Sequence, residues 1–336
     1  MSDRTQRDGR RLVSMVVPLL DEEENVAGIV ERFDVIRQMY PEYDFELVAV
    51  DDGSTDGTLE ALRRHITNRA DGTIVVLSRN FGSHAAITAG LSTLSGDCAI
   101  VVGGDLQEPA DLVGRLLAEW ESGYDVVWGV RDQRVDQRAV GRVLSSWFTK
   151  LFTHISDLDN YPTEGPSGVL CSRQVVDVVI DMKERNRNVL GLMAWSGFRQ
   201  CSIQYRQRAR AAGESKWSTK KRLKLAIDSF AQFSFAPVRA MTYSGLVIAS
   251  LGFLYALFLV GRRVFSAPPL EGWTTVVVLV LILGGMQLVM LGVLGEYLWR
   301  GVDEARARPL YVIRETVRSG AISESAAGDD ELRGGS

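Results

Sequence analysis

The stretch VVGGDLQEP, residues 101–109, joins the end of an apolar run to a single carboxylate. The run is CAIVV, residues 98–102; the pair Gly103-Gly104 breaks it, and Asp105 follows. Read alone, this pattern predicts a strand that ends in a turn, because glycine and aspartate are common turn residues. Whether it also forms part of a site depends on how the neighbouring strands end.

Short apolar runs alternate with longer amphipathic stretches over the first 200 residues. The runs predict strands at 12–17, 46–50, 73–77, 99–102 and 125–128. The stretches between them have helical periodicity and predict helices at 25–40, 59–70, 84–94 and 111–122. Strands that alternate with helices form βαβ units, so we expect an α/β fold with a mostly parallel sheet.

The distinctive polar residues follow the predicted strands. Ligands of parallel sheets bind beyond the carboxyl ends of the strands. These ends carry Pro18, Leu19, Asp21, Glu22, Asp51, Asp52, Arg79, Gly104 and Asp105. One acidic strand end is more often a turn or a helix cap, but several at one edge of one sheet favour a binding site.

The chemistry of these strand ends points to a cation. The sequence contains neither a GxGxxG nor a GK[ST] loop, which disfavours a dinucleotide site or a P-loop. Acidic strand ends without a glycine-rich phosphate cradle favour a cation that holds substrate phosphates. We expect Mg²⁺ or Mn²⁺, because Mg²⁺ commonly takes one or two carboxylates together with substrate phosphates.

Two uncharged stretches lie near the C-terminus, at 241–261 and 273–295. About 20 apolar residues cross a bilayer as a helix, so both predict membrane spans, at about 241–261 and 273–297. The alternative is a pair of buried core helices. The connector 262–272 is too short for a domain, so the spans should form a hairpin.

Lysines and arginines gather before the first span and after the second. This pattern predicts that both chain ends are cytoplasmic in a multi-pass protein of the inner or plasma membrane.

These patterns predict the organisation of the whole chain. Residues 1–11 form a flexible N-terminus without the apolar core of a signal peptide. The soluble domain covers 12–215, an amphipathic juxtamembrane segment 216–238, and the hairpin 239–299. A cytoplasmic juxtamembrane segment at 300–318 precedes a disordered tail at 319–336. For 216–238, an ordinary helix packed on the soluble domain is the alternative to a helix that lies on the membrane.

Bulk composition excludes other classes. The formal net charge is −4, so nothing overall suggests a nucleic-acid partner. The cysteines Cys98, Cys171 and Cys201 are scattered without a CxxC pair, which fits neither a zinc site nor a disulfide framework. We expect buried thiols in a reducing compartment. The oligomeric state is left open, with a homo-oligomer among the alternatives.

Seven motifs together resemble glycosyltransferase family 2, and within it the membrane-anchored polyprenyl-phosphate glycosyltransferases. The resemblance runs from about residue 12 to residue 315. Its motifs are VSMVVPLLDEEENV, VAVDDGSTDGT, LSRNFGSHAAITAGL, GGDLQEPADLV, VVWGVRDQR, RAAGESKW and GEYLWRGVDEARARPLYVIRE. Each is weak alone, but their order and the two spans that accompany them make the resemblance specific.

The resemblance implies a GT-A nucleotide-sugar domain and inverting transfer of a sugar from a nucleotide diphosphate to a lipid phosphate. It implies that Pro18, Asp21, Glu22 and Asp52 surround the base and ribose, with Leu19, Asp51, Arg79 and Gly104 completing the nucleotide-sugar site. Asp105 and Gln107 would meet the metal and diphosphate, and Arg131, Arg134, Arg210 and Lys216 the acceptor phosphate. The residues that the resemblance implies for catalysis are then Asp105, Arg131, Arg210 and Lys216.

The chemistry agrees with these residue types. A phosphate monoester has a second pKa of about 6 and is largely dianionic at pH 7, so this acceptor needs no general base. It needs cations that hold it in line with the anomeric carbon, which arginine does bidentately. A metal ion would neutralise charge on the departing nucleoside diphosphate.

The chain departs from the family pattern in three places. Gly103 and Glu108 stand where the family usually has aspartates, Asp21 stands in place of an asparagine, and segment 164–170 lacks the Asp and Arg of Gly-Asp-Phe-Arg-Leu. We expect a working site with few protein ligands to the metal. We expect UDP-glucose first as the donor, because it is the common donor in the bacterial branch of the family that the chain resembles. GDP-mannose, a UDP-aminosugar, another lipid or polysaccharide acceptor, and an inactive membrane scaffold are the alternatives.

Overall fold

The computed structural model describes residues 9–132, 161–162, 166–182, 184, 187–206, 236–264 and 272–318. The chain divides into two compact units, one from Met1–Arg222 with Pro309–Ser336 and one from Leu223–Arg308. Three predicted site residues, Arg134, Arg210 and Lys216, lie outside the described residues. So do segment 207–235 and the tail 319–336.

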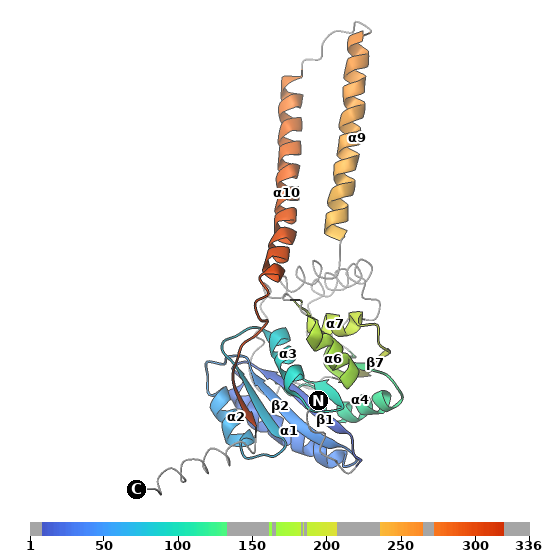
Figure 1. The fold of residues 1–336 in the computed structure, drawn as a ribbon. Helices are drawn as coiled ribbons and strands as arrows, with labels where there is room; N and C mark the ends of the chain where they lie inside the picture. Colours follow the sequence, from blue (N-terminus) through green and yellow to red (C-terminus); the bar gives the residue numbers. More distant parts are fainter. Residues whose placement is uncertain are drawn as a thin grey trace, which may run out of the picture. The chain divides into compact units, whose positions relative to one another are not determined.

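The described part of the first unit contains an eight-stranded sheet in the order β7-β5-β6-β4-β1-β2-β3-β8 (Figure 1). The strands are β1 (Leu12–Leu19), β2 (Asp44–Asp51), β3 (Gly72–Leu77), β4 (Cys98–Val101), β5 (Val126–Arg131), β6 (Pro166–Ser172), β7 (Gln200–Tyr205) and β8 (Ile313–Arg318). β1 runs parallel to β2 and β4, β2 to β3, and β5 to β7. The predicted, mostly parallel sheet is confirmed.

Helices cover both faces of this sheet. They are η1 (Glu23–Asn25), α1 (Val26–Met39), α2 (Thr58–Ile66), α3 (Ser83–Thr93), α4 (Asp111–Glu121), α6 (Arg173–Asp181) and α7 (Val189–Trp195). The central strand β1, LVSMVVPL, is buried along almost its whole length, as a strand covered on both faces should be. Met15 packs in one core with Phe33 of α1 and Leu116 of α4. On the other face, a Cβ at Gly90 of α3 would lie 2.4 Å from Val16 Cγ1, so glycine lets α3 approach β1 closely.

The strand β8 closes the β3 edge of the sheet, although it follows the two long helices of the other unit in sequence. It pairs antiparallel with β3. The backbone N–H of Ser78 donates to the carbonyl of Val312 at 2.9 Å, and Arg63 of α2 forms an ion pair of 2.6 Å with Glu315. The chain therefore returns to its first unit after leaving it, which the sequence patterns did not predict.

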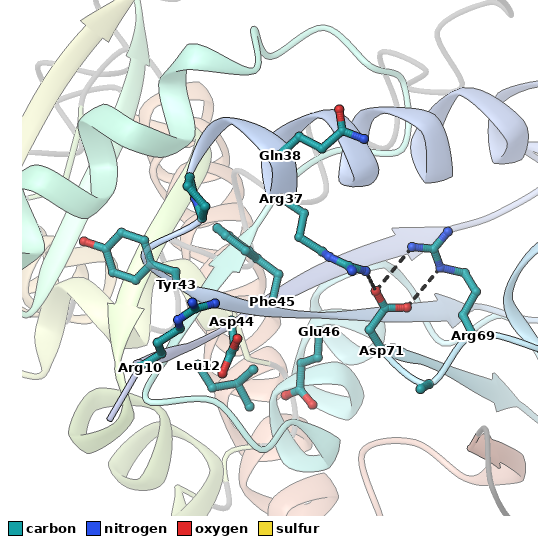
Figure 2. A pocket seen from close by; sticks show the side chains of 12 residues that line it. Arg10, Leu12, Arg37, Gln38, Tyr43, Asp44, Phe45, Glu46, Arg69 and Asp71 are labelled. Atoms are coloured by element: carbon teal, nitrogen blue, oxygen red, sulfur yellow. Dashed lines mark hydrogen bonds and ion pairs between the residues drawn. The ribbon is translucent and has the colours of Figure 1, made fainter. Parts of the chain in front are cut away.

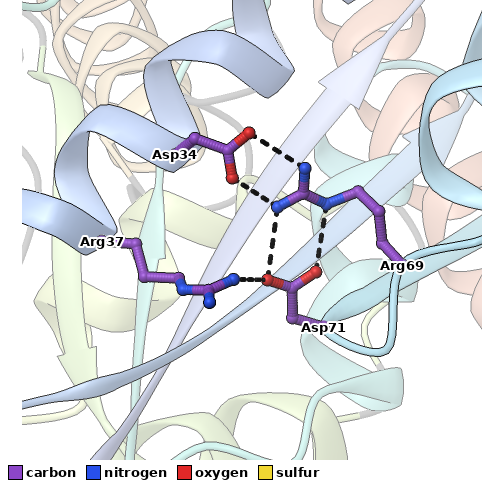
Figure 3. A network of polar contacts seen from close by, with 4 residues as sticks. All are labelled: Asp34, Arg37, Arg69 and Asp71. Atoms are coloured by element: carbon purple, nitrogen blue, oxygen red, sulfur yellow. Dashed lines mark hydrogen bonds and ion pairs between the residues drawn. The ribbon is translucent and has the colours of Figure 1, made fainter.

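Figure 3 shows a network of charges that joins α1 to the turn before β3. Arg69 contacts Asp34 through Nη1, at 3.0 Å from Oδ2, and Asp71 through Nε, at 3.0 Å from Oδ1. Arg37 of α1 also pairs with Asp71. The hydrogen bond from the Arg69 guanidinium lowers the pKa of the Asp34 carboxyl group below its ordinary value.

The second unit contains α9 (Ala236–Val264) and α10 (Trp273–Ala305). A Cβ at Gly245 would lie 3.2 Å from Met290 Cε, so the two helices contact each other at this small residue. Among the described residues, Ile282–Ala305 is long and apolar enough to cross a membrane, and Met241–Tyr255 is a shorter apolar helix. Large apolar side chains on both helices are exposed, including Phe253 at 66% and Leu288 at 71%. These side chains are not buried against other described residues of the chain.

Candidate active site

The carboxyl ends of β1 and β4 form the point where the strand order of the sheet reverses. From β1 the chain proceeds through α1 to β2, and it reaches β4, on the other side of β1, only after β3 and α3. Open α/β sheets bind ligands at such a switch point. Gly104 lies here, where a Cβ would be 2.6 Å from Leu19 Cδ2 and 3.4 Å from the Pro18 carbonyl oxygen. Glycine therefore lets the two strand ends meet.

The loops after β1 and β2 are tied together by the predicted acidic residues. Asp21 Oδ1 accepts a hydrogen bond from the backbone N–H of Thr55 at 2.7 Å, and the Asp21 N–H donates to Ser54 Oγ at 2.9 Å. The N–H of Glu22 donates to Thr58 Oγ1 at 2.8 Å. Asp21 has φ = 48°, a left-handed conformation that aspartate tolerates better than most residues. These contacts fix the shape of the edge.

The two carboxylates at the end of β2 hold the neighbouring backbone. Asp51 accepts from the N–H of Ser54 at 3.0 Å. Asp52, which is 3% exposed, accepts from Phe81 N–H at 2.7 Å and Gly82 N–H at 2.9 Å. Burial raises the pKa of Asp52, and the two backbone hydrogen bonds oppose that rise. Asp52 thus positions the loop after β3.

Arg79, in that loop, is exposed and stacks on its neighbour. Its Cζ lies 4.1 Å from the ring centroid of Phe81, and its Nη1 donates to the carbonyl of Asn80. A Cβ at Gly53 would lie 2.4 Å from the carbonyl carbon of Arg79, so the loops after β2 and β3 also meet through a glycine. The guanidinium is thereby held at the carboxyl edge.

The Asp105 loop contains a strained residue that two contacts hold in place. Leu106 has φ = 58°, which is unusual for a bulky side chain. Its carbonyl accepts a hydrogen bond of 2.8 Å from Arg32 Nη2, and its Cδ1 would lie 2.7 Å from a Cβ at Gly28. Such strain persists where surrounding structure enforces it, often at functional sites. The sequence did not single out Arg32, because a surface-type charge on an amphipathic helix gives no signal of this contact.

Glu108 lies at the candidate site and was not among the predicted site residues. Its side chain is 4% exposed, and its Oε2 has no hydrogen-bond partner among the described residues. Burial, and then the neighbouring Asp105 carboxylate, raise the pKa of Glu108 to about 7. A Cβ at Gly103 would lie 3.1 Å from Asp105 Oδ1 and 3.5 Å from Glu108 Oε1, so both carboxylates border the volume left by that glycine. The sequence showed Glu108 only as a departure from the family pattern, which usually has an aspartate there.

Arg131 ends β5 at the same edge of the sheet. Both β4 and β5 are antiparallel to β6 and therefore run in the same direction. The buried Nε of Arg131 has no hydrogen-bond partner in the part of the chain that the structure describes. The described residues thus bring Asp21, Asp51, Asp105 and Arg131 to one edge.

The residues of the Asp105 loop fit a divalent cation. Asp105, Gln107 and Glu108 offer oxygen donors, and Oε2 of Glu108, which is unpaired among the residues that the structure describes, is a buried acceptor that a cation would satisfy. The described residues contain no cluster of three or more His, Cys, Asp or Glu placed to hold a metal. Two carboxylates and an amide suit Mg²⁺ or Mn²⁺, because Mg²⁺ keeps waters and binds substrate phosphates as well.

A groove at the opposite edge of the sheet is distinct from this site. Figure 2 shows that it is lined by Leu12 and Asp44 at the amino ends of β1 and β2, and that Arg37 and Arg69 turn towards Asp71. Two of the arginines that line this groove, Arg37 and Arg69, are engaged in the network of Figure 3. The carboxyl edge remains the candidate site.

Comparison with known proteins assigns the family. The model of "Glycosyl transferase family 2" matches residues 14–180. A Bacillus subtilis protein, "Uncharacterized glycosyltransferase YkcC", is 35% identical over 303 residues, covering 90% of this chain and 93% of that protein. The "SfII prophage-derived bactoprenol glucosyl transferase" of Shigella flexneri is 34% identical over 308 residues, covering 91% of this chain and 98% of that protein. A crystal structure of glucosyl-3-phosphoglycerate synthase from Mycobacterium tuberculosis, in complex with Mn²⁺, UDP-glucose and phosphoglyceric acid, matches with a TM-score of 0.46 and 19% identity, over 66% of this chain and 78% of that one. The chain belongs to glycosyl transferase family 2 and is a glycosyltransferase.

Proposed function

We propose that this protein transfers a sugar from a nucleotide diphosphate sugar to the phosphate of a polyprenyl lipid at the cytoplasmic face of the membrane. The observation that carries the proposal is the convergence of Asp21, Asp51, Asp105 and Arg131 at the carboxyl edge of the sheet, around the switch point of β1 and β4. The similarity to bactoprenol glucosyl transferases over nine-tenths of the chain supports the lipid acceptor.

The acidic residues would serve the nucleotide and the metal, and the basic residue would bind the acceptor phosphate. The loops held by Asp21, Asp51 and Asp52 form the nucleotide side of the site. Asp105 and Gln107 would hold Mg²⁺ or Mn²⁺, which when bound neutralises the charge of the leaving diphosphate. Arg131, whose Nε is buried without a partner among the described residues, is available to an acceptor phosphate. No general base is required, because the acceptor is already dianionic at neutral pH.

The strand β8 supports the proposed two-span topology. The chain leaves the first unit after β7 and re-enters the same sheet at β8. A chain that crosses a membrane between these two strands must cross it an even number of times. The exposed apolar side chains of α9 and α10 suit lipid, and the contact between Gly245 and Met290 suits a helical hairpin. The sheet would then lie on the cytoplasmic side, where lysines and arginines concentrate.

UDP-glucose is the proposed donor, since relatives 34% identical to this chain are named bactoprenol glucosyl transferases. The experiment gives the purified full chain, in detergent, radiolabelled UDP-, GDP- and dTDP-sugars with undecaprenyl phosphate and Mg²⁺ or Mn²⁺. Label that enters the lipid phase only with metal supports the proposal, and the donor that labels best identifies the sugar. Label found only on another lipid or a polymer, or on nothing with any donor, would overturn it.

A further inference from the structure

Gly103 and Glu108 are linked through the space between them. The point where a side chain at 103 would begin is 3.1 Å from Asp105 Oδ1 and 3.5 Å from Glu108 Oε1. An acidic side chain at 103 would therefore contact two carboxylates. The glycine leaves that volume open, and the longer glutamate at 108 reaches it.

The burial of Glu108 needs an explanation. A buried carboxylate is costly unless it is paired or coordinates a metal. The side chain is 4% exposed, Oε2 accepts no hydrogen bond from the described residues, and no ion pair of Glu108 is found within them. Arg131 is near enough to influence Glu108 electrostatically, yet the buried Nε of Arg131 also has no hydrogen-bond partner in the described ranges. Within the described residues, both side chains thus present a buried polar atom that no protein group satisfies.

We propose that Glu108 is the second carboxylate ligand of the divalent cation and takes the place of the acidic residue that position 103 lacks. The inference deepens the proposed function and rests on it for the identity of the cation. The donor set becomes Asp105, Gln107 and Glu108, with water and donor phosphates completing the shell of Mg²⁺ or Mn²⁺. The cation would then have two carboxylate ligands, Asp105 and Glu108, and one amide ligand, Gln107.

The test measures binding of Mn²⁺ alone to the full chain in detergent, from the electron paramagnetic resonance signal of the free ion. Glu108→Gln should weaken Mn²⁺ binding about tenfold or more, given that even residues that only support metal ligands change affinity by about 10–100-fold. Asp111→Asn removes an exposed negative charge three residues further along and should leave the affinity unchanged. Thermal unfolding of each variant establishes that it is folded.

A rescue experiment distinguishes a Glu108 that binds the metal from a Glu108 that only stabilises the fold. Gly103→Asp alone should weaken binding, because the new side chain meets both carboxylates. The double variant Gly103→Asp/Glu108→Ala moves the second carboxylate to position 103 and should recover most of the affinity that Glu108→Ala loses.

The proposal is overturned if wild-type protein binds no Mn²⁺, if Glu108→Gln binds it as tightly as wild type, or if the double variant is no better than Glu108→Ala. These outcomes are separable from failure of the proposed function. Unchanged Mn²⁺ affinity in Glu108→Gln together with active sugar transfer rejects only the role of Glu108. Binding that depends on Glu108 without transfer from any donor rejects only the proposed reaction.

Discussion

The guanidinium of Arg32, on α1, donates a hydrogen bond of 2.8 Å to the carbonyl oxygen of Leu106, in the loop that carries Asp105. Leu106 has φ = 58°, so the loop holds a conformation that the leucine would not adopt by preference. A helix on the protein surface thereby fixes the position of the residues expected to meet the metal.

Arg32→Ala should reduce the rate of sugar transfer by about 10- to 100-fold, because a misplacement of about 1 Å at a reacting centre has effects of this size. Steady-state transfer assays would measure it, with Arg64→Ala, an exposed change on α2, as the matched control. Equal rates for the two variants would show that the Arg32 contact does not position the loop.

The deletion of residues 309–336 should expose the edge of β3 and cause aggregation. β8 covers this edge, and an uncovered strand edge pairs readily with other chains. Size-exclusion chromatography in detergent would measure the effect. The control deletion of 319–336 keeps β8 and should elute like the full chain. A monodisperse, active 309–336 deletion would contradict the structural role of β8.

The main sheet and its site edge could be predicted from the sequence, because β1 to β5 and α1 to α4 have clear periodicity. β6 could not, since its sequence PSGVLCS begins with proline and contains glycine, and its strand conformation comes from pairing between β4 and β5. β8 reads IRETVR, a short and charged stretch after a long helix, and its partner β3 lies far away in the sequence.

The acidic strand ends were predictable, but their contacts were not. The sequence pattern placed Asp52 at the carboxyl edge. The hydrogen bonds that Asp52 accepts from the backbone N–H groups of Phe81 and Gly82 depend on how the loop after β3 folds over β2. Glu108 was visible only as a departure from the family pattern. Its burial, and the lack of a partner for Oε2 within the described part of the chain, depend on tertiary structure that no spacing rule supplies.

Asp34→Asn should lower the free energy of unfolding at pH 7, and the difference from wild type should shrink as the pH falls. Arg69 holds the pKa of Asp34 below its ordinary value of 3.8, so the folded chain binds the proton less readily than the unfolded chain. The contribution is therefore present above about pH 4 and is lost as the pH falls through the folded pKa. The side chain of Asp34 is 40% exposed, so the loss should not exceed about 1 kcal/mol.

Thermal unfolding of the full chain in detergent, between pH 7 and pH 3, would check this prediction. Glu24→Gln, at an exposed site on η1, removes a carboxylate that has no contact with Arg69 and serves as the control. A difference between wild type and Asp34→Asn that grows on acidification would contradict the assigned ion pair.

The central claim is that the carboxyl edge around Asp105 carries out metal-dependent sugar transfer. The most direct measurement compares Asp105→Asn with Asp111→Asn for transfer of labelled sugar to undecaprenyl phosphate in the presence of Mg²⁺ or Mn²⁺. Asp105→Asn keeps the shape of the side chain and removes its charge, so transfer should fall to background, while Asp111→Asn should retain wild-type transfer. Transfer by Asp105→Asn at the wild-type rate and with the same dependence on metal would contradict the account.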